Sequence, residues 1–308
     1  MNDKIFAIVN PVSANGDTGK KWPYFEKLIR ESGIDLDYVY TEYPMHAKDL
    51  ARDAIESGYN IILSVGGDGT MNEVLNGFFS DEKLIDEDAA LAIFSRGTGC
   101  DAIRTLGLRK DVESIIKILK MRKTEKYDVG LVEFTDYHGN KLKRYFLNVS
   151  DVGLGGETTN RVNKNSKALK GFLSFLIGAL TTMIVYKNKD FQVIIDDLEI
   201  NKRLNSVIVA NGKYFGGGMK IAPMAKMDDG YFDIIIIENI NKLDLLINFP
   251  KIYKGNHLSH PKVKHFKGKN IIVKSKQKAL IEVDGEQPGL IEAKFQILPR
   301  KIKIITGE

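Results

Sequence analysis

The sequence predicts a two-domain protein, an α/β domain built on a parallel sheet followed by a mostly antiparallel β-sandwich. The length of 308 residues corresponds to about two domains, because domains commonly contain about 100–200 residues. In the first part of the chain, strand and helix patterns alternate, which indicates a parallel sheet covered by helices. After residue 130, strand patterns follow one another with turns between them. We therefore place the domains at residues 1–130 and 131–308, and about the last 15 residues could pack back on the first domain.

Apolar and β-branched runs that end in turn residues define four expected strands in the first domain. The run Asn60–Val65 is rich in β-branched and other aliphatic residues, which indicates a strand buried on both faces. The expected strands are 5–10, 36–41, 60–65 and 90–95, and the expected helices are 20–32, 45–57, 70–76 and 111–121. Ligands of such sheets bind at the carboxyl ends of the strands, so a site is expected in the loops that follow them.

The second domain is expected to consist of short strands joined by Gly, Asp and Asn turns. Strand patterns occur at 131–133, 144–149, 191–195, 205–210, 231–237, 270–273, 279–283, 293–297 and 301–305. Helices are expected around 167–186 and 242–254. Many strands without regularly alternating helices favour an antiparallel sandwich or barrel.

The positive charge of the chain is concentrated in one segment. The formal net charge is +5, from 45 basic and 40 acidic residues. Residues 251–280 contain nine Lys, three His and no Asp or Glu, so the rest carries 36 basic against 40 acidic groups, a net −4. Such a cluster indicates an anionic partner. We expect an anionic membrane surface and no nucleic acid, because only Tyr253 and Phe266 could stack on bases there.

Cysteine content and hydropathy favour a cytoplasmic protein. The single cysteine, Cys100, excludes an internal disulfide and fits a reducing compartment. The apolar run near the N-terminus has five residues, too few for the core of a signal peptide. The longest apolar stretch, 172–186, has 15 residues, whereas a bilayer span needs about 20. We expect a cytoplasmic protein with peripheral contact at the inner face of the membrane, and a homodimer is left open.

The sequence Gly-Gly-Asp-Gly-Thr at residues 66–70 is the strongest local indication of a binding site. It lies directly between the buried strand and a helix. Its glycines permit positive φ angles, backbone N–H groups can turn toward phosphate oxygens, and the start of the helix adds partial positive charge. Asp68 would repel a phosphate, so we expect it to hold Mg²⁺, a water or the loop itself. A strand-to-helix turn without a ligand is the alternative.

Polar loops follow the other strands of the same sheet. Asn10 and Ser13 come after the first strand, Thr41 ends the second, and Thr98 comes after the fourth. If the sheet is parallel, these loops share one edge with residues 66–70, and their side chains can donate hydrogen bonds to one polyanion. Neither a Walker A sequence nor a dinucleotide fingerprint occurs in the chain.

Two acidic turns in the second domain are candidates for metal binding and proton transfer. Asp228-Asp229-Gly230 precedes an apolar strand, and Asp284-Gly285-Glu286 follows another. Mg²⁺ prefers oxygen ligands, and phosphoryl transfer to an alcohol needs a carboxylate to accept the hydroxyl proton. Simple Asp-Gly turns are the alternative at both places.

These motifs together resemble the bacterial diacylglycerol kinase catalytic family, soluble lipid kinases related to the sphingosine kinases, over nearly the whole chain. The GGDG core alone is also found in NAD kinases and phosphofructokinases, which implies a similar Rossmann-like first domain. The later motifs make the resemblance specific. The matching residues are Asn10-Pro11-x-Ser13, Thr41 with His46-Ala47, 66–70 with Asn72-Glu73, Gly97-Thr98 with Asp101, Asn148 with Gly153, Asn211-Gly212, 216–218, Pro223-x-Ala225 with Asp229-Gly230, and 284–286.

The resemblance implies an ATP-dependent kinase with a nucleotide-binding first domain and a lipid-substrate second domain, with diacylglycerol as the leading acceptor. It implies Mg²⁺ on the ATP phosphates, Glu286 as proton acceptor, Asp284 as its partner or rival, and Asp68 as a further catalytic candidate. It also implies a structural Mg²⁺ held by the side chain of Asp229 and the backbone carbonyls of Lys226 and Tyr231. The expected ATP contacts are Asn10, Pro11, Ser13, Ala14, Thr41, Gly66, Gly67, Asp68, Gly69, Thr70, Asn72, Glu73 and Thr98.

The chain departs from the family pattern in the fourth loop, where Ser95 stands in place of a proline and Cys100 in place of an asparagine. We interpret Cys100 as a small residue in a tight loop rather than a reactive thiol. The departure bears on ATP affinity and motivates one alternative, a lipid-binding regulator without catalysis. An NAD kinase-like phosphotransferase is the other alternative. The motifs do not identify the acceptor lipid, because glycine loops report phosphate and not acyl chains.

Overall fold

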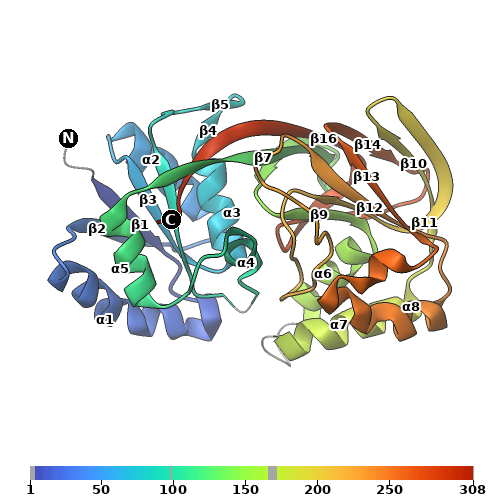
Figure 1. Cartoon of the computed structure of the whole chain (residues 1–308), viewed down its shortest axis with the longest axis horizontal. Coiled ribbons are helices and arrows are strands. Elements are labelled where there is room, and N and C mark those ends of the chain that lie inside the picture. The colour runs from blue at the N-terminus through green and yellow to red at the C-terminus, as the bar shows by residue number, and fades with distance from the viewer. Residues whose placement is uncertain (1–3, 98, 166–171, 308) are drawn as a thin grey trace. The chain divides into compact units, whose positions relative to one another are not determined.

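The computed structural model describes residues 4–97, 99–165 and 172–307, and the chain divides into two compact units (Figure 1). Unit 1 runs to Tyr127 and resumes at Arg300, and unit 2 is Asp128–Pro299. The division falls close to residue 130, where the sequence pattern changes. The last residues of the chain return to unit 1, so unit 1 is discontinuous in sequence.

Unit 1 is built on a parallel sheet with the strand order β16-β6-β3-β1-β2. β1 pairs in parallel with β2 and β3, β3 pairs with β6, and β6 pairs with the end of β16. This is the pairing that alternating strands and helices predict. The strands are β1 (Ile5–Val9), β2 (Leu36–Tyr40), β3 (Ile61–Gly66), β6 (Ala90–Ser95) and β16 (Glu286–Ile305), beside the short hairpin β4 (Phe79–Ser80) and β5 (Lys83–Leu84).

Both faces of this sheet are buried. On one face, side chains of β1, β3 and β6 form a core with α1 and α5, which includes Trp22 and Phe94. Ile8 and Ile62 point to the opposite face and are fully buried, where α2 and α3 contact each other and the strands β1 and β3. The helices are α1 (Asp17–Glu31), α2 (His46–Glu56), α3 (Asp68–Gly77), α4 (Asp101–Leu106) and α5 (Val112–Met121), with the 3₁₀ turn η1 (Ser13–Gly16).

Unit 2 is antiparallel, and its sheet closes through two long strands. β11 pairs with β10 along its first half and with β9 and β12 along its second half. β16 pairs first with β15 and then with β14, while β15 also pairs with β9 and β14 with β10. The strands are β7 (Thr124–Thr135), β8 (Lys141–Phe146), β9 (Val149–Gly153), β10 (Lys189–Ile195), β11 (Leu198–Ala210), β12 (Phe232–Glu238), β13 (Val263–Gly268), β14 (Asn270–Lys274) and β15 (Leu280–Val283).

The strands of unit 2 enclose an apolar core on one face and contribute to a second apolar cluster, and helices lie beside them. Phe146 and Phe232 stack in this core with their ring centroids 5.6 Å apart. Every helix in the described residues falls short of the length and hydropathy that a bilayer crossing needs. The helices are α6 (Leu154–Asn165), α7 (Phe172–Val185) and α8 (Lys242–Asn248), with the 3₁₀ turns η2 (Phe249–Lys254) and η3 (Asn256–Ser259).

Truncation of Phe94 tests the core of unit 1. Phe94 is fully buried, and its ring centroid lies 5.2 Å from that of Phe25. We expect Phe94→Ala to lower the free energy of unfolding of unit 1 by about 3–5 kcal/mol through the cavity it leaves. Urea unfolding followed by the fluorescence of Trp22, the single tryptophan, measures this. Tyr24→Ala is the control, because that side chain is 60% exposed, and equal midpoints for both variants would contradict the packing described.

Candidate active site

The loops at the carboxyl ends of β1, β2 and β3 meet at one edge of the unit 1 sheet. The Nδ2 of Asn10 donates a hydrogen bond to the Oγ1 of Thr70 at 2.9 Å. The backbone N–H of Asn10 donates to the carbonyl of Val65, and that of Thr41 donates to the carbonyl of Val9, each at 2.9 Å. The structure therefore brings together Asn10, Thr41 and the 66–70 loop, as a parallel sheet requires.

The glycines of the 66–70 loop allow close approach rather than unusual backbone angles. Positive φ was the expected reason for them, and this expectation is wrong for Gly66 and Gly67, which take ordinary negative angles. A Cβ on Gly66 would overlap the Thr70 side chain, and a Cβ on Gly97 would lie 2.6 Å from the Cα of Gly67. The third and fourth strands can therefore bring their loops into contact only because these positions lack side chains.

Asp68 holds the fourth loop. Its Oδ2 accepts the backbone N–H of Asp101 at 3.4 Å, and its Oδ1 accepts that of Ala102 at 3.3 Å. Burial raises the pKa of Asp68, and these backbone donors act in the opposite direction. Of the three expected roles for Asp68, the contacts support the one in which it holds the loop. A carboxylate at the start of α4 is also favourable for the dipole of that helix.

The first turn of α3 is the part of the rim that can bind an anion. Gly67 precedes this helix in an extended conformation and has no side chain with which to cap it. The N–H groups at the start of a helix lack intrahelical acceptors, and together with the helix dipole they attract phosphate. Thr70 and Asn10 lie beside this turn through their mutual hydrogen bond.

Several predicted nucleotide contacts have other partners in the structure. Asn72 is fully buried and Glu73 accepts the backbone N–H of Ala47 at 3.3 Å, so both serve packing within unit 1. The Ser13 hydroxyl donates to the Oγ1 of Thr18 at 2.6 Å. Pro11 and Ala14 belong to the same loop, where Ala14 takes a positive φ of 51°. The predicted contact at position 98 lies outside the described residues.

The two departures in the fourth loop are buried. Cys100 takes a positive φ of 54° before α4, and its Sγ lies 2.9 Å from the carbonyl oxygen of Gly97. Burial is the main cause that raises the pKa of the Cys100 thiol, which disfavours the reactive thiolate. Ser95 closes β6 and is likewise buried. The interpretation of Cys100 as a small residue in a tight loop agrees with this placement.

In unit 2, the turn after β15 is fixed by Asp284. This residue is buried, takes a positive φ of 46°, and accepts three backbone N–H groups. Its Oδ2 accepts from Leu147 at 2.9 Å, and its Oδ1 accepts from Asn148 at 3.0 Å and Val149 at 3.1 Å. A carboxylate with this many donors is satisfied as an anion and is therefore an anchor.

Motif residues that are far apart in the sequence contact the segment whose backbone binds Asp284. The backbone N–H groups of Asn211 and Gly212 donate to the carbonyl of Asn148, and the Asn211 side chain donates to the carbonyl of Leu147 at 2.7 Å. The asparagines therefore support the segment that Asp284 holds. Sequence reasoning identified both as motif residues without finding this supporting role, because the contacts join residues more than 60 positions apart.

Glu286 differs from Asp284 in its surroundings. It begins β16, and its side chain is exposed, whereas Asp284 is buried. Gly285 lies between them with a φ of 89°, so the two acids are joined by a turn that favours glycine. The accessible carboxylate of the pair is therefore Glu286.

Two family profiles match most of the chain. The profile described as the diacylglycerol kinase catalytic domain matches residues 4–132, and that described as the YegS C-terminal NAD kinase beta sandwich-like domain matches residues 148–306. The chain belongs to the diacylglycerol kinase family. These matches confirm the resemblance that the sequence motifs indicated. The protein is a lipid kinase.

Relatives and solved structures extend the match over the full length of the kinase. A diacylglycerol kinase of Staphylococcus epidermidis is 28% identical over 99% of this chain and 93% of the relative. That of Staphylococcus saprophyticus is 27% identical over 99% and 96%. A crystal structure of a diacylglycerol kinase from Bacillus anthracis superposes with a TM-score of 0.71 at 20% identity, over 98% of this chain and 96% of that chain. Another structure from that organism gives 0.78 at 24% identity, over 98% and 95%.

The turn at Asp229 carries an ion pair in the kinase. The Oδ2 of Asp229 lies 2.6 Å from the Nζ of Lys267, and its Oδ1 accepts the N–H of Tyr231 at 3.1 Å. The described residues contain no group of three or more His, Cys, Asp or Glu side chains placed to hold a metal. The Asp229 carboxylate is paired with an ammonium in this structure, and the ligation of Mg²⁺ by Asp229, Lys226 and Tyr231 remains a prediction.

Acidic side chains neutralise part of the basic segment 251–280. Besides the Lys267 pair, His265 lies 2.6 Å from the Oδ1 of Asp233, and Lys274 lies 3.1 Å from Glu292. A charge count restricted to residues 251–280 misses these pairs, because the acidic partners lie elsewhere in the chain. The exposed lysines of the segment that make no ion pair within the described residues are Lys251, Lys254, Lys264, Lys269, Lys276 and Lys278.

Gly97→Ala tests the contact between the third and fourth loops of the kinase. The new Cβ would lie 2.6 Å from the Cα of Gly67, so one loop must move. Since small displacements of a binding loop commonly cost about 100-fold, we expect kcat/KM for ATP to fall by about 10–100-fold. The KM for the lipid acceptor should change by less than about twofold. Steady-state kinetics with each substrate varied measures both, and an unchanged kcat/KM for ATP would contradict the assignment of this edge.

Proposed function

We propose that this kinase transfers the γ-phosphoryl group of ATP to the hydroxyl group of diacylglycerol and so forms phosphatidic acid. The observation that carries the proposal is the pair Asp284 and Glu286, a buried anchoring carboxylate beside an exposed one. The relatives named diacylglycerol kinase support the choice of acceptor. The proposal divides the work between the two units.

The rim of unit 1 would bind the phosphates of ATP. The first turn of α3 supplies backbone N–H groups and the positive end of the helix dipole. Asn10 and Thr70 lie beside it as side-chain donors, and Gly66, Gly67 and Gly97 leave room for phosphate oxygens. Asp68 keeps the fourth loop against the third through its hydrogen bonds to Asp101 and Ala102. Mg²⁺ arrives with ATP as part of the substrate and neutralises phosphate charge.

Glu286 would accept the proton of the lipid hydroxyl. A general base must be accessible and free to bind a proton. Asp284 already accepts three backbone N–H groups, and protonating it would weaken all three. Asp284 therefore serves to fix the turn, and Glu286 takes the proton as the hydroxyl oxygen attacks the γ-phosphorus and the bond to ADP breaks.

Glu286→Gln and Asp284→Asn separate these two roles. We expect Glu286→Gln to lower kcat by about 100–10,000-fold, the usual contribution of a general base. Its free energy of unfolding should change by less than about 0.5 kcal/mol, since the side chain is exposed. Asp284→Asn should lower the free energy of unfolding by about 1–3 kcal/mol, because one amide cannot satisfy the three donors.

Labelled ATP and mixed micelles of diacylglycerol measure the activity, and urea unfolding measures stability. NAD in place of the lipid is the soluble-acceptor control. Phosphorylation of NAD but not of lipid would favour the NAD kinase alternative. Lipid binding without turnover on any acceptor would favour a regulator. A wild-type rate in Glu286→Gln would exclude Glu286 as the base.

We further propose that the kinase works from the cytoplasm, peripherally at the inner face of the membrane. Two observations support the surface formed by α8 and the turn η2 that follows it. Leu243 and Ile247 of α8 are 68% and 65% exposed and lie one helical turn apart. Lys251 and Lys254 in η2 are exposed and unpaired within the described residues. Apolar side chains flanked by lysines are typical of contact with anionic lipid.

Vesicle binding tests this surface. We expect the double variant Lys251→Gln, Lys254→Gln to bind phosphatidylserine vesicles about 30-fold more weakly, since each lysine near an anionic surface contributes about 1 kcal/mol. Lys267→Gln is the matched control and should bind nearly as wild type, because Asp229 already neutralises Lys267. Sedimentation with vesicles at low and high salt measures both. Binding indifferent to salt and to the double variant would show that this surface does not contact lipid.

A further inference from the structure

Two buried acids that the proposed reaction does not use face each other behind the turn of Glu286. Glu282 of β15 lies directly opposite Asp151 of β9 in the antiparallel ladder. Their residues are only 4% and 3% exposed. Side chains directly opposite in such a ladder have Cβ atoms about 4.5–5.5 Å apart, and like charges there are destabilising. Two ionised carboxylates would repel each other in these positions, so the charge state of the pair needs an explanation.

Each acid holds a different piece of backbone. The Oε1 of Glu282 accepts the N–H of Gly285, the residue between Asp284 and Glu286. Asp151 accepts the N–H of Gly155 at the start of α6 and the hydroxyl of Ser206 at 3.4 Å. Glu282 therefore acts on the turn that carries the proposed base, and Asp151 acts on the start of α6.

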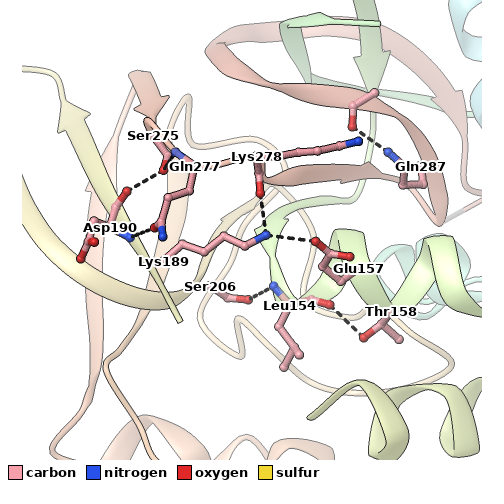
Figure 2. Close-up of polar contacts among 11 residues, drawn as sticks. Leu154, Glu157, Thr158, Lys189, Asp190, Ser206, Ser275, Gln277, Lys278 and Gln287 are labelled. Carbon is pink, nitrogen blue, oxygen red and sulfur yellow. Dashed lines mark hydrogen bonds and ion pairs between the residues drawn. The ribbon is translucent and has the colours of Figure 1, made fainter. Parts of the chain in front are cut away.

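The described residues contain no cation in an ion pair with either acid. The Nζ of Lys189 is bonded to the Oε1 of Glu157 at 3.0 Å and to the carbonyl of Lys278 at 2.7 Å (Figure 2). Within the described residues, neither Asp151 nor Glu282 makes an ion pair. Each keeps one buried oxygen without a hydrogen-bond partner, Oδ1 of Asp151 and Oε2 of Glu282.

The surroundings disfavour two negative charges on the pair. Burial raises the pKa of Asp151 to about 7. Burial also raises the pKa of Glu282 well above its usual range, and the charges of Asp151, Asp284 and Glu286 add to the effect. Asp151 also acts on Tyr186, after α7, and burial raises the pKa of that tyrosine. A proton between the two unpartnered oxygens would satisfy both.

We propose that Glu282 is a positioning residue for phosphoryl transfer: with a proton shared between it and Asp151, its Oε1 fixes the Gly285 amide and thereby the direction of Glu286. The proposal rests on the assignment of Glu286 as the base. The shared proton stays on the pair during the reaction. An ionised Glu282 would add a negative charge beside Glu286 and make it harder for Glu286 to remain ionised before it accepts the hydroxyl proton.

Glu282→Gln and Glu282→Leu distinguish positioning from packing. Glutamine keeps a neutral oxygen acceptor for the Gly285 N–H, so we expect kcat within about threefold of wild type, whereas leucine should lower kcat by about 10–100-fold. The KM for ATP should stay within about twofold in both. Asp233→Asn, which removes another buried acid of unit 2, is the control. A wild-type kcat in Glu282→Leu, or an equal loss in both Glu282 variants, would overturn the proposal.

The pH profile gives a readout that loss of packing alone would not change. Above the pH at which the wild-type pair loses its proton, kcat should fall, and Glu282→Gln should move this basic limb by at least about one pH unit upward. Asp233→Asn should leave the limb in place. A basic limb that is the same in wild type and Glu282→Gln would overturn the role of the shared proton.

The amide of Gly285 can be observed without any reaction. In protein labelled with ¹⁵N-glycine, Glu282→Leu should speed hydrogen exchange at Gly285 by at least about tenfold, and Glu282→Gln should not. Asp151→Asn should lower the pH at which the Gly285 resonance titrates, because Glu282 then ionises without a charged neighbour. If the wild type phosphorylated no lipid, the proposed function would be wrong. Hydrogen exchange at Gly285 would still decide whether Glu282 holds the turn. Unchanged exchange in Glu282→Leu would show that it does not.

Discussion

The unit 2 site depends on one buried carboxylate that receives three consecutive backbone N–H groups. Asp284 binds the amides of Leu147, Asn148 and Val149, and so joins the turn after β15 to the start of β9. Hydrogen bonds to a charged acceptor are stronger than neutral ones, and a buried carboxylate without them would be costly. The exposed Glu286 therefore lies on a turn whose backbone is held from inside.

Unit 1 uses the same device with different residues. Asp68 accepts the amides of Asp101 and Ala102, and so holds the loop after β6 against the loop after β3. In both units an inward-facing carboxylate fixes backbone, and the groups left accessible beside it are the ones suited to chemistry. In unit 1 these are the amides at the start of α3, and in unit 2 the carboxylate of Glu286. Acidic motif residues in such a protein can thus be structural even when they lie at the centre of a site.

Local patterns predicted the parallel and antiparallel halves, the division near residue 130 and the loops at the strand ends, because each depends on neighbours in sequence. The reason for Gly66 was not predictable, and the sequence could not choose among the three expected roles of Asp68, since both depend on groups that the fold brings in. The same holds for Lys267, which a composition count treats as a free charge and the structure pairs with Asp229. The sequence identified Asp284 and Glu286 as a pair, but only their different burial in the structure assigns them different roles.

The return of β16 to unit 1 has a consequence for how the chain is made. Lys303 and Ile304 pair with Ala90 and Leu91 of β6, so the sheet of unit 1 gains this strand from residues that are synthesised after all of unit 2. During translation, β6 has no such neighbour until all of unit 2 has left the ribosome. An open strand edge is a site where chains pair wrongly. A fragment ending at residue 127 would keep that edge permanently, so unit 1 is not a module that can be separated by one cut.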